Sequence, residues 1–253
     1  MTNIYNKPCD IDREHVRLAS EFLAEQGVSE FFYGITTKAL MPVTNEFKKL
    51  RRRMPKEMLK ASYGIYSTDS IRTFRHRYLQ HFASGDEAYF DKNLSGLNVW
   101  RDPDYSGGKG EQFKRLMNEY SIASRALWLL PIKYNPDWYA VFVMFSPLDR
   151  KTLSQKLNAN HEQIDYQLKL YSSLFNEQCI AQLNPISNFN CLSPKAIQVL
   201  ELTAQGYSCE EIGEQLVMTE SGVHYHQNRL KELFNAKNRA QLVSFAHTLG
   251  VLE

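Results

Sequence analysis

The chain of 253 residues contains no apolar run near the length of about 20 residues that crosses a membrane. Its first 20 residues lack the apolar core of a signal peptide, so we expect a cytoplasmic protein that makes no use of a membrane. Cys9, Cys179, Cys191 and Cys209 form no Cys-x-x-Cys pair and no spacing typical of metal ligands. We therefore expect reduced thiols and no metal site.

Catalytic and cofactor signals are also missing. No glycine-rich phosphate loop is present, and the serines, histidines and aspartates form no recognisable catalytic arrangement, so we predict neither an enzyme nor a cofactor. The net charge of +2 favours no class of partner. Positive charge is concentrated only at residues 48–60, KKLRRRMPKEMLK, with seven basic residues and one acid. We interpret this segment as a solvated helix or loop, with an accessory phosphate contact as the alternative.

The first 183 residues mix helical and strand patterns. Residues 12–26 have helical spacing that ends at Gly27, and VSEFFYGI follows as a strand. Two more strands flank the turn KYNPD, and helical stripes lie on either side of them. One runs from Phe113 to Tyr120 and the other from Ile164 to Cys179. This order predicts an α-β-α sandwich, and with the helical end of the chain an α+β protein.

A break follows at residues 184–190, NPISNFN, which is rich in Asn, Ser and Pro and has no apolar period. We place a linker over residues 184–191. It separates a domain of residues 1–183 from a small all-α domain of residues 192–253.

Capping signals divide the small domain into four helices. Ser193 with Pro194 begins the first, Ser208 with Glu211 forms a capping box for the second, and Thr219 begins the third. Asn238 and Gln241 predict a further capping box for the fourth helix, which Gly250 ends.

The third helix carries unusual polar residues. At about 100° per residue, Val223, His226, Leu230 and Leu233 share an inner face. The opposite side presents Ser221, His224, Tyr225 and Asn228. Such short hydrogen-bonding side chains on a rigid helix suit the major groove of DNA. An ordinary four-helix bundle with a polar solvent face explains the pattern equally well.

Residues 192–252 resemble the DNA-binding domain of LuxR-type transcription regulators. The family pattern has a Leu-Ser start, Val-Leu, Ala-x-Gly, Glu-Ile, a Thr cap, Val-x-x-His, Asn-Arg and a closing Leu-Gly. The matching residues are Leu192, Ser193, Val199, Leu200, Ala204, Gly206, Glu211, Ile212, Leu216, Thr219, Val223, His226, Asn238, Arg239 and Gly250. The resemblance implies double-stranded DNA as a partner.

It also implies roles for single residues. His224, Tyr225 and Asn228 would contact bases, and Thr219, Ser221 and Lys231 would hold phosphates. His226 would be a buried, hydrogen-bonded core residue and not a metal ligand. Gly222 departs from the family's usual Thr or Ser. Residues 192–253 hold five basic and seven acidic side chains, a net charge of −2, so we expect a homodimer to be needed for useful affinity.

Residues 1–183 are similar to the sensor domain of the acyl-homoserine-lactone receptors in this family. FRHRY resembles an aromatic pair that places Phe74 and Tyr78 on one helical face. Asp86, with Asp91 as a rival, lies near the family's amide-binding Asp, and Trp100 near its carbonyl-binding Trp. The similarity implies a pocket for a small amphipathic ligand, an acyl-homoserine lactone or another compound. The alternative is that the aromatic residues fill a core and that Asp86 is exposed in a turn.

These patterns together predict a cytoplasmic, homodimeric, ligand-responsive transcription regulator of the quorum-sensing LuxR type. One alternative is a regulator of the same architecture that binds no small molecule and is controlled by a partner protein. Another is an enzyme or small-molecule-binding protein whose C-terminal bundle is merely structural.

Overall fold

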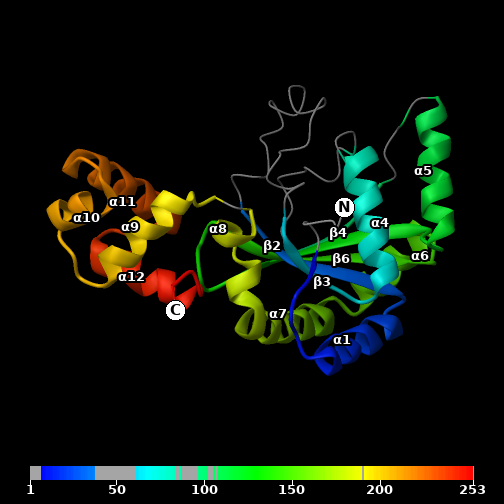
Figure 1. Cartoon of the computed structure of the whole chain (residues 1–253). Coiled ribbons are helices and arrows are strands. Elements are labelled where there is room, and N and C mark those ends of the chain that lie inside the picture. The colour runs from blue at the N-terminus through cyan, green and yellow to red at the C-terminus, as the bar shows by residue number, and fades with distance from the viewer. Residues whose placement is uncertain are drawn as a thin grey trace. The chain divides into compact units, whose positions relative to one another are not determined.

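The structure is a computed structural model that describes residues 7–37, 61–83, 86, 96–101, 105, 107–189 and 191–252. The basic segment 48–60 and Asp91 lie outside these residues. The chain divides into two compact units, Met1–Cys179 and Ile180–Glu253 (Figure 1). Among the described residues, no helix combines the length and apolar character needed to cross a membrane.

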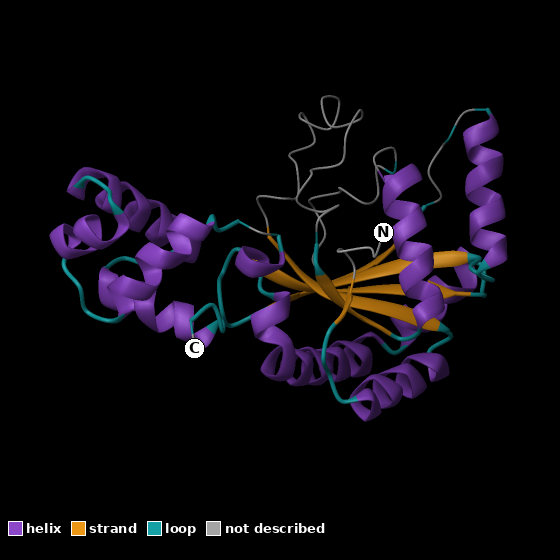
Figure 2. Cartoon of the chain, in the orientation of Figure 1, coloured by secondary structure: helices purple, strands orange, loops and turns teal. Residues whose placement is uncertain are grey.

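A six-stranded sheet forms the centre of the first unit (Figure 2). The strands are β1 (Lys7–Pro8), β2 (Glu30–Thr37), β3 (Tyr63–Tyr66), β4 (Gly96–Val99), β5 (Ser124–Pro131) and β6 (Trp138–Ser146). Their order is β1-β3-β2-β6-β5-β4, and only the pair β1 and β3 is parallel. The turn between β5 and β6 forms as KYNPD predicts, because the Asn135 side chain accepts a 2.8 Å hydrogen bond from the backbone N–H of Asp137.

Alternation along the strands places helices on both faces of this sheet. Phe32 of β2 belongs to a buried cluster with residues of α4 (Asp69–His81) and α5 (Gly108–Glu119). Its neighbours Phe31 and Tyr33 point the other way and contact Phe175 of α7 (His161–Leu183). In Figure 1, α4 and α5 lie on one side of the sheet, and α1 (Arg13–Glu25) and α7 on the other. Helix α6 (Arg150–Ala159) follows β6 in the chain. The predicted α-β-α sandwich is confirmed.

The second unit contains the four helices that the caps predicted. They are α9 (Pro194–Ala204), α10 (Cys209–Leu216), α11 (Glu220–Phe234) and α12 (Arg239–Thr248). The hydroxyl oxygens of Ser193, Ser208 and Thr219 each accept a backbone N–H at the start of a helix. Glu211 completes the capping box of α10 by accepting the N–H of Ser208 at 2.7 Å.

Two local predictions differ from the structure. Asn238 caps α12, but the Gln241 side chain accepts from the N–H of Lys237 and not from that of Asn238, so the predicted capping box is wrong. The segment expected as a linker also contains a short helix, α8 (Pro185–Asn188). The buried side chain of Asn184 caps α8 and donates to the carbonyl of Leu249 at 3.1 Å, which gives this polar stretch its own order. The division at 184–191 stays a prediction.

Candidate functional site

The outward face of α11 is built as the sequence predicted. Ser221, His224, Tyr225 and Asn228 are all exposed, with 62% of Tyr225 open to solvent. Thr219 lies at the start of the helix, where its hydroxyl oxygen accepts the N–H of Gly222 at 3.1 Å. The hydroxyl proton remains available to a phosphate oxygen.

The inward face of α11 differs from the prediction at two of its four positions. The buried side chains are Val223, Gln227, Leu230 and Phe234, whereas His226 and Leu233 are half-buried. Gln227 donates from Nε2 to the hydroxyl of Thr203 on α9 at 3.0 Å. The expectation of a buried, hydrogen-bonded His226 is therefore wrong: Gln227 has that role, because contact with α9 rotates the buried stripe of α11.

A close turn holds α11 against α10. The N–H of Met218 donates to the carbonyl of Gly213 at 2.8 Å, and a Cβ on Gly213 would lie 2.8 Å from the Met218 carbonyl oxygen. Between them Val217 has a φ of +52° and is 93% exposed. The turn therefore requires glycine at position 213, because the structure has no room for a Cβ atom there. The helical period of the sequence does not reveal this requirement.

Two of the few basic side chains of this unit, Lys195 and Arg239, connect parts of the bundle. Lys195 donates to the carbonyl of Leu216 at 2.7 Å, and Arg239 donates to the carbonyls of Thr203, at 3.0 Å, and Tyr207. Arg229 pairs with Glu232 on the surface at 2.7 Å. Lys231 is half-buried near the end of α11. Since little positive charge is left over, the phosphate backbone offers this unit a weak electrostatic contact.

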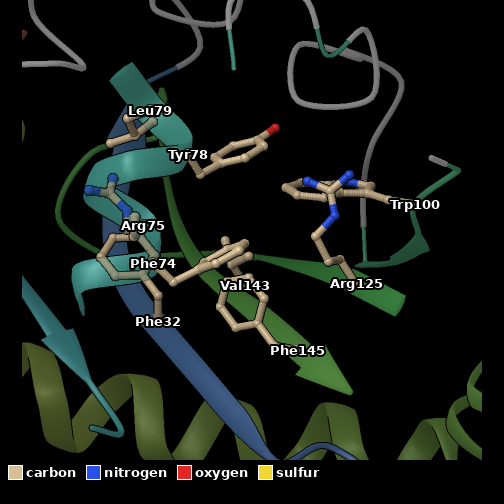
Figure 3. A pocket seen from close by; sticks show the side chains of 9 residues that line it. All are labelled: Phe32, Phe74, Arg75, Tyr78, Leu79, Trp100, Arg125, Val143 and Phe145. Carbon is tan, nitrogen blue, oxygen red and sulfur yellow. The ribbon is translucent and has the colours of Figure 1, made fainter. Parts of the chain in front are cut away.

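The second candidate site lies in the first unit, between α4 and the sheet. Figure 3 shows its lining, which joins residues of α4, β2, β5 and β6 with Trp100. Phe74 and Tyr78 stack with their ring centroids 6.1 Å apart, and both line the same cavity as Trp100. The free volume is about 20 Å³, room for about one or two water molecules.

A buried charge cluster adjoins this cavity. Asp86 is fully buried, so the alternative of an exposed Asp86 in a turn is wrong. Its Oδ2 accepts the hydroxyl of Tyr78 at 2.6 Å and lies 3.0 Å from Nη2 of Arg125. The structure thus brings together Phe74, Tyr78, Asp86 and Trp100, and adds Arg125. Arg125 was not among the site residues that the sequence predicted.

Aromatic rings surround the guanidinium of Arg125. Its Cζ lies 4.8 Å from the ring centre of Trp100 and 5.2 Å from those of Tyr78 and Phe113. Burial acts to lower the pKa of Arg125, but the adjacent Tyr78 oxygen and Asp86 carboxylate outweigh it and raise that pKa. Burial, and then the Asp86 charge, raise the pKa of Tyr78 well above its ordinary value, although Arg125 opposes the rise. At neutral pH Tyr78 is therefore a neutral donor and Arg125 a cation.

One sequence signal could have found Arg125. It lies in β5 two residues before Leu127 and four before Leu129, and both leucines face the cavity side with Trp100. A single arginine at a buried position of an apolar strand has to be paired or functional. The uninterrupted apolar run begins only at Ala126, whereas the strand begins at Ser124, so the run by itself hides this pattern.

The C-terminal part of the chain matches a known protein family. Residues 190–246 match the family model of bacterial regulatory proteins, luxR family. The HTH-type quorum-sensing regulator RhlR of Pseudomonas aeruginosa is 30% identical over 196 residues, which cover 75% of this chain and 75% of RhlR. The chain belongs to the LuxR family. It is a DNA-binding transcription regulator and not an enzyme, as predicted.

More distant similarities are confined to one part or to low scores. The oxygen regulatory protein NreC of Staphylococcus epidermidis is 31% identical over 91 residues, which are 34% of this chain and 42% of NreC. A crystal structure of Escherichia coli SdiA aligns with 96% of the chain and 93% of SdiA, at 16% identity and a TM-score of 0.39. That TM-score is too low to indicate a shared ligand.

Proposed function

We propose that this LuxR-family protein is a cytoplasmic, dimeric regulator whose sensor pocket binds a small amphipathic molecule and whose α11 recognises operator DNA. The arrangement of α11 supports the second half of this proposal. Ser221, His224, Tyr225 and Asn228 are exposed together on a helix that is fixed by a buried hydrogen bond and a tight turn. This rigid display is what base recognition in the major groove requires.

In this proposal the exposed side chains of α11 have different tasks. Asn228 can pair bidentately with adenine, while His224 and Tyr225 contact base edges or a thymine methyl group. Thr219, Ser221 and Lys231 hold phosphates and so fix the register without selecting a sequence.

The ligand half of the proposal rests on the cavity beside α4. Phe74 and Tyr78 line one wall, and Trp100 lies across from them in Figure 3. The hydroxyl of Tyr78 donates to Asp86. An aromatic wall with a few converging polar groups is typical of small-molecule sites. Since RhlR is a quorum-sensing regulator, an acyl-homoserine lactone is one candidate, and other small amphipathic compounds are the rest.

The net charge of the C-terminal unit supports the proposed dimer. A single C-terminal unit of net charge −2 gains little from phosphate contacts, whereas two linked copies on a two-fold site double the specific contacts. The outer side of α12 and parts of the sensor are the surfaces we propose for association.

One observation favours a second candidate, a regulator without a small-molecule ligand. Asp86 already accepts a hydrogen bond from Tyr78 and pairs with Arg125, and the free volume beside them is about 20 Å³. In that case the cluster is structural and a partner protein supplies control.

The test is a selection of duplex DNA from a random pool by the full-length protein, followed by gel retardation and sedimentation. We expect a two-fold symmetric site bound by a dimer. Tyr225→Ala should lose preference for that site, and Gln205→Ala, at the exposed C-cap of α9, should keep it. A monomer that binds the selected site tightly would contradict the dimer. If cell extracts leave the melting temperature of the protein unchanged, the second candidate, a regulator without a small-molecule ligand, is favoured.

A further inference from the structure

The guanidinium of Arg125 has more hydrogen-bonding capacity than its surroundings use. Arg125 is only 2% exposed. Its Nη2 lies 3.0 Å from Asp86 as an ion pair, yet neither Nη1 nor Nη2 has a hydrogen-bond partner among the described residues. Buried guanidinium groups normally donate several hydrogen bonds, because each unmet donor is costly away from water.

The atoms that surround this guanidinium on the described side chains are mostly carbon. Three aromatic rings lie within 5.2 Å of its Cζ, and Figure 3 shows the group against the face of Trp100 with the Tyr78 hydroxyl turned toward it. The Tyr78 proton is donated to Asp86. Since no described residue accepts a hydrogen bond from Nη1 or Nη2, a molecule in the cavity can supply the acceptor for Arg125.

The charges around the cavity indicate what that acceptor is. Arg75 also lines the cavity, with its Cζ 4.0 Å from the ring centre of Phe32. The two lining arginines and the adjacent Asp86 give the described site a net positive charge. Apart from Tyr78 and Trp100, the remaining lining is apolar: Phe32, Phe74, Leu79, Val143 and Phe145. A carboxylate matches the forked donors of arginine in both charge and geometry.

We propose that the ligand is a small, largely apolar carboxylic acid whose carboxylate accepts hydrogen bonds from Arg125, on the side of the guanidinium away from Asp86. This inference rests on the proposed ligand-binding function and narrows its chemistry. Arg125 then contacts two carboxylates, that of Asp86 and that of the ligand. The positive charge of Arg75 balances the second negative charge. Since the free volume is about 20 Å³, side chains have to move to admit the apolar part, which favours short or flat acids.

The experiment compares matched probes on the full-length protein. Phenylacetate, 3-phenylpropionate and octanoate are the acids, phenylacetamide is the neutral match of the first, and N-butanoyl-homoserine lactone represents the lactones. Binding is measured by thermal shift and by tryptophan fluorescence, since Trp100 lines the cavity. We expect at least one acid to raise the melting temperature, and phenylacetamide to bind about tenfold or more weakly than phenylacetate.

Variants locate the effect. Arg125→Lys keeps the charge and loses the fork, and should weaken binding of the acid about tenfold or more. Arg77→Met is the control. Arg77 lies on α4, the helix that carries Phe74 and Tyr78, but it pairs with Glu119 at the surface and does not line the cavity. If Arg125→Lys does not fold, the double variant Arg125→Met/Asp86→Asn removes both charges and should fold and bind the acid equally poorly.

The outcomes separate this inference from the proposed function. Lactone or amide binding as tight as that of the acids, or acid binding that survives in the Arg125 variants, overturns the inference and leaves a ligand-responsive regulator. If none of the probes binds, the inference is also wrong. If a cell extract then raises the melting temperature, the proposed ligand-binding function still holds. If no extract raises it, both the carboxylic-acid inference and the proposed ligand-binding function are wrong.

Discussion

The two candidate sites of this protein use polar side chains in opposite ways. On α11 they belong to one helix, are exposed and have few partners. In the first unit, Tyr78, Asp86 and Arg125 come from three separate segments and are buried against one another. The first arrangement is cheap to form and ready for a partner, whereas the second forms only when the whole fold has closed around it.

The difference in burial sets what a substitution costs. An exposed pair such as Arg229 and Glu232 contributes at most about 1 kcal/mol, because water competes with each partner. A buried pair contributes little net stability when intact, but the removal of one partner leaves a charge without compensation.

The largest effect is expected at Asp86. Asp86→Ala leaves the Arg125 cation buried without its counter-charge and should lower the free energy of unfolding by about 3–5 kcal/mol. Chemical denaturation of the full-length protein, followed by tryptophan fluorescence, measures it. Asp69→Ala, which breaks the exposed pair with Arg72, should cost about 1 kcal/mol or less. Equal decreases in the free energy of unfolding of the two variants would show that the buried pair is no more important for stability than the exposed pair.

Two glycines of the second unit form the next contrast. Gly213→Ala places a methyl group 2.8 Å from the Met218 carbonyl oxygen, and should destabilise the unit by about 1–3 kcal/mol. Gly222→Ala meets only Thr219 Oγ1 at 3.3 Å and the flexible end of Met218 at 3.4 Å. It should therefore stabilise α11, by up to about 1 kcal/mol. Thermal unfolding monitored by circular dichroism compares them, and a stable Gly213→Ala would refute the close turn.

Asn228 should behave as the reverse of Asp86. Asn228→Ala removes an exposed side chain, so the free energy of unfolding should change by less than about 0.5 kcal/mol. Binding to the selected operator should nevertheless weaken by about 1–3 kcal/mol. Lys231→Ala should instead weaken all sequences alike and flatten the dependence on salt. Fluorescence anisotropy at several salt concentrations distinguishes the two, and unchanged sequence preference in Asn228→Ala would rule out its role in base recognition.

The smallest effect concerns the capping box of α10. Glu211 accepts the backbone N–H of Ser208, and this hydrogen bond lowers the pKa of its carboxyl group. The carboxylate therefore stabilises the folded state above the unfolded pKa of about 4.3, and this contribution is lost as the pH falls through the lower folded value. Glu211→Gln should flatten the stability profile in that acidic range. The same slope in both proteins would exclude Glu211 as the source.

Local rules accounted for much of the fold. Alternating residues of β2 separate Phe32 from Phe31 and Tyr33, which is enough to predict helices on both faces of the sheet. Side-chain caps fixed the starts of α9, α10, α11 and α12, because a cap acts on the nearest backbone N–H groups. The exposed face of α11 followed from its helical period.

Long-range contacts decided the rest. His226 and Gln227 are neighbours on α11, and the buried one is Gln227 because Thr203 of α9 offers it a hydrogen bond. The period of a helix cannot choose between adjacent stripes when both contain a polar residue. The role of Arg125 depends in the same way on Asp86, which is 39 positions away in the sequence.

The sequence by itself therefore determined the residues that begin α9, α10, α11 and α12, the helices on both faces of the sheet, and the family, since these depend on residues a few positions apart or on a pattern of fixed spacings. Only the tertiary structure placed Arg125 beside Asp86 and Tyr78 under three aromatic rings. Burial and pairing are properties of what surrounds a side chain after folding, and for this cluster the surroundings come from segments that no local pattern connects.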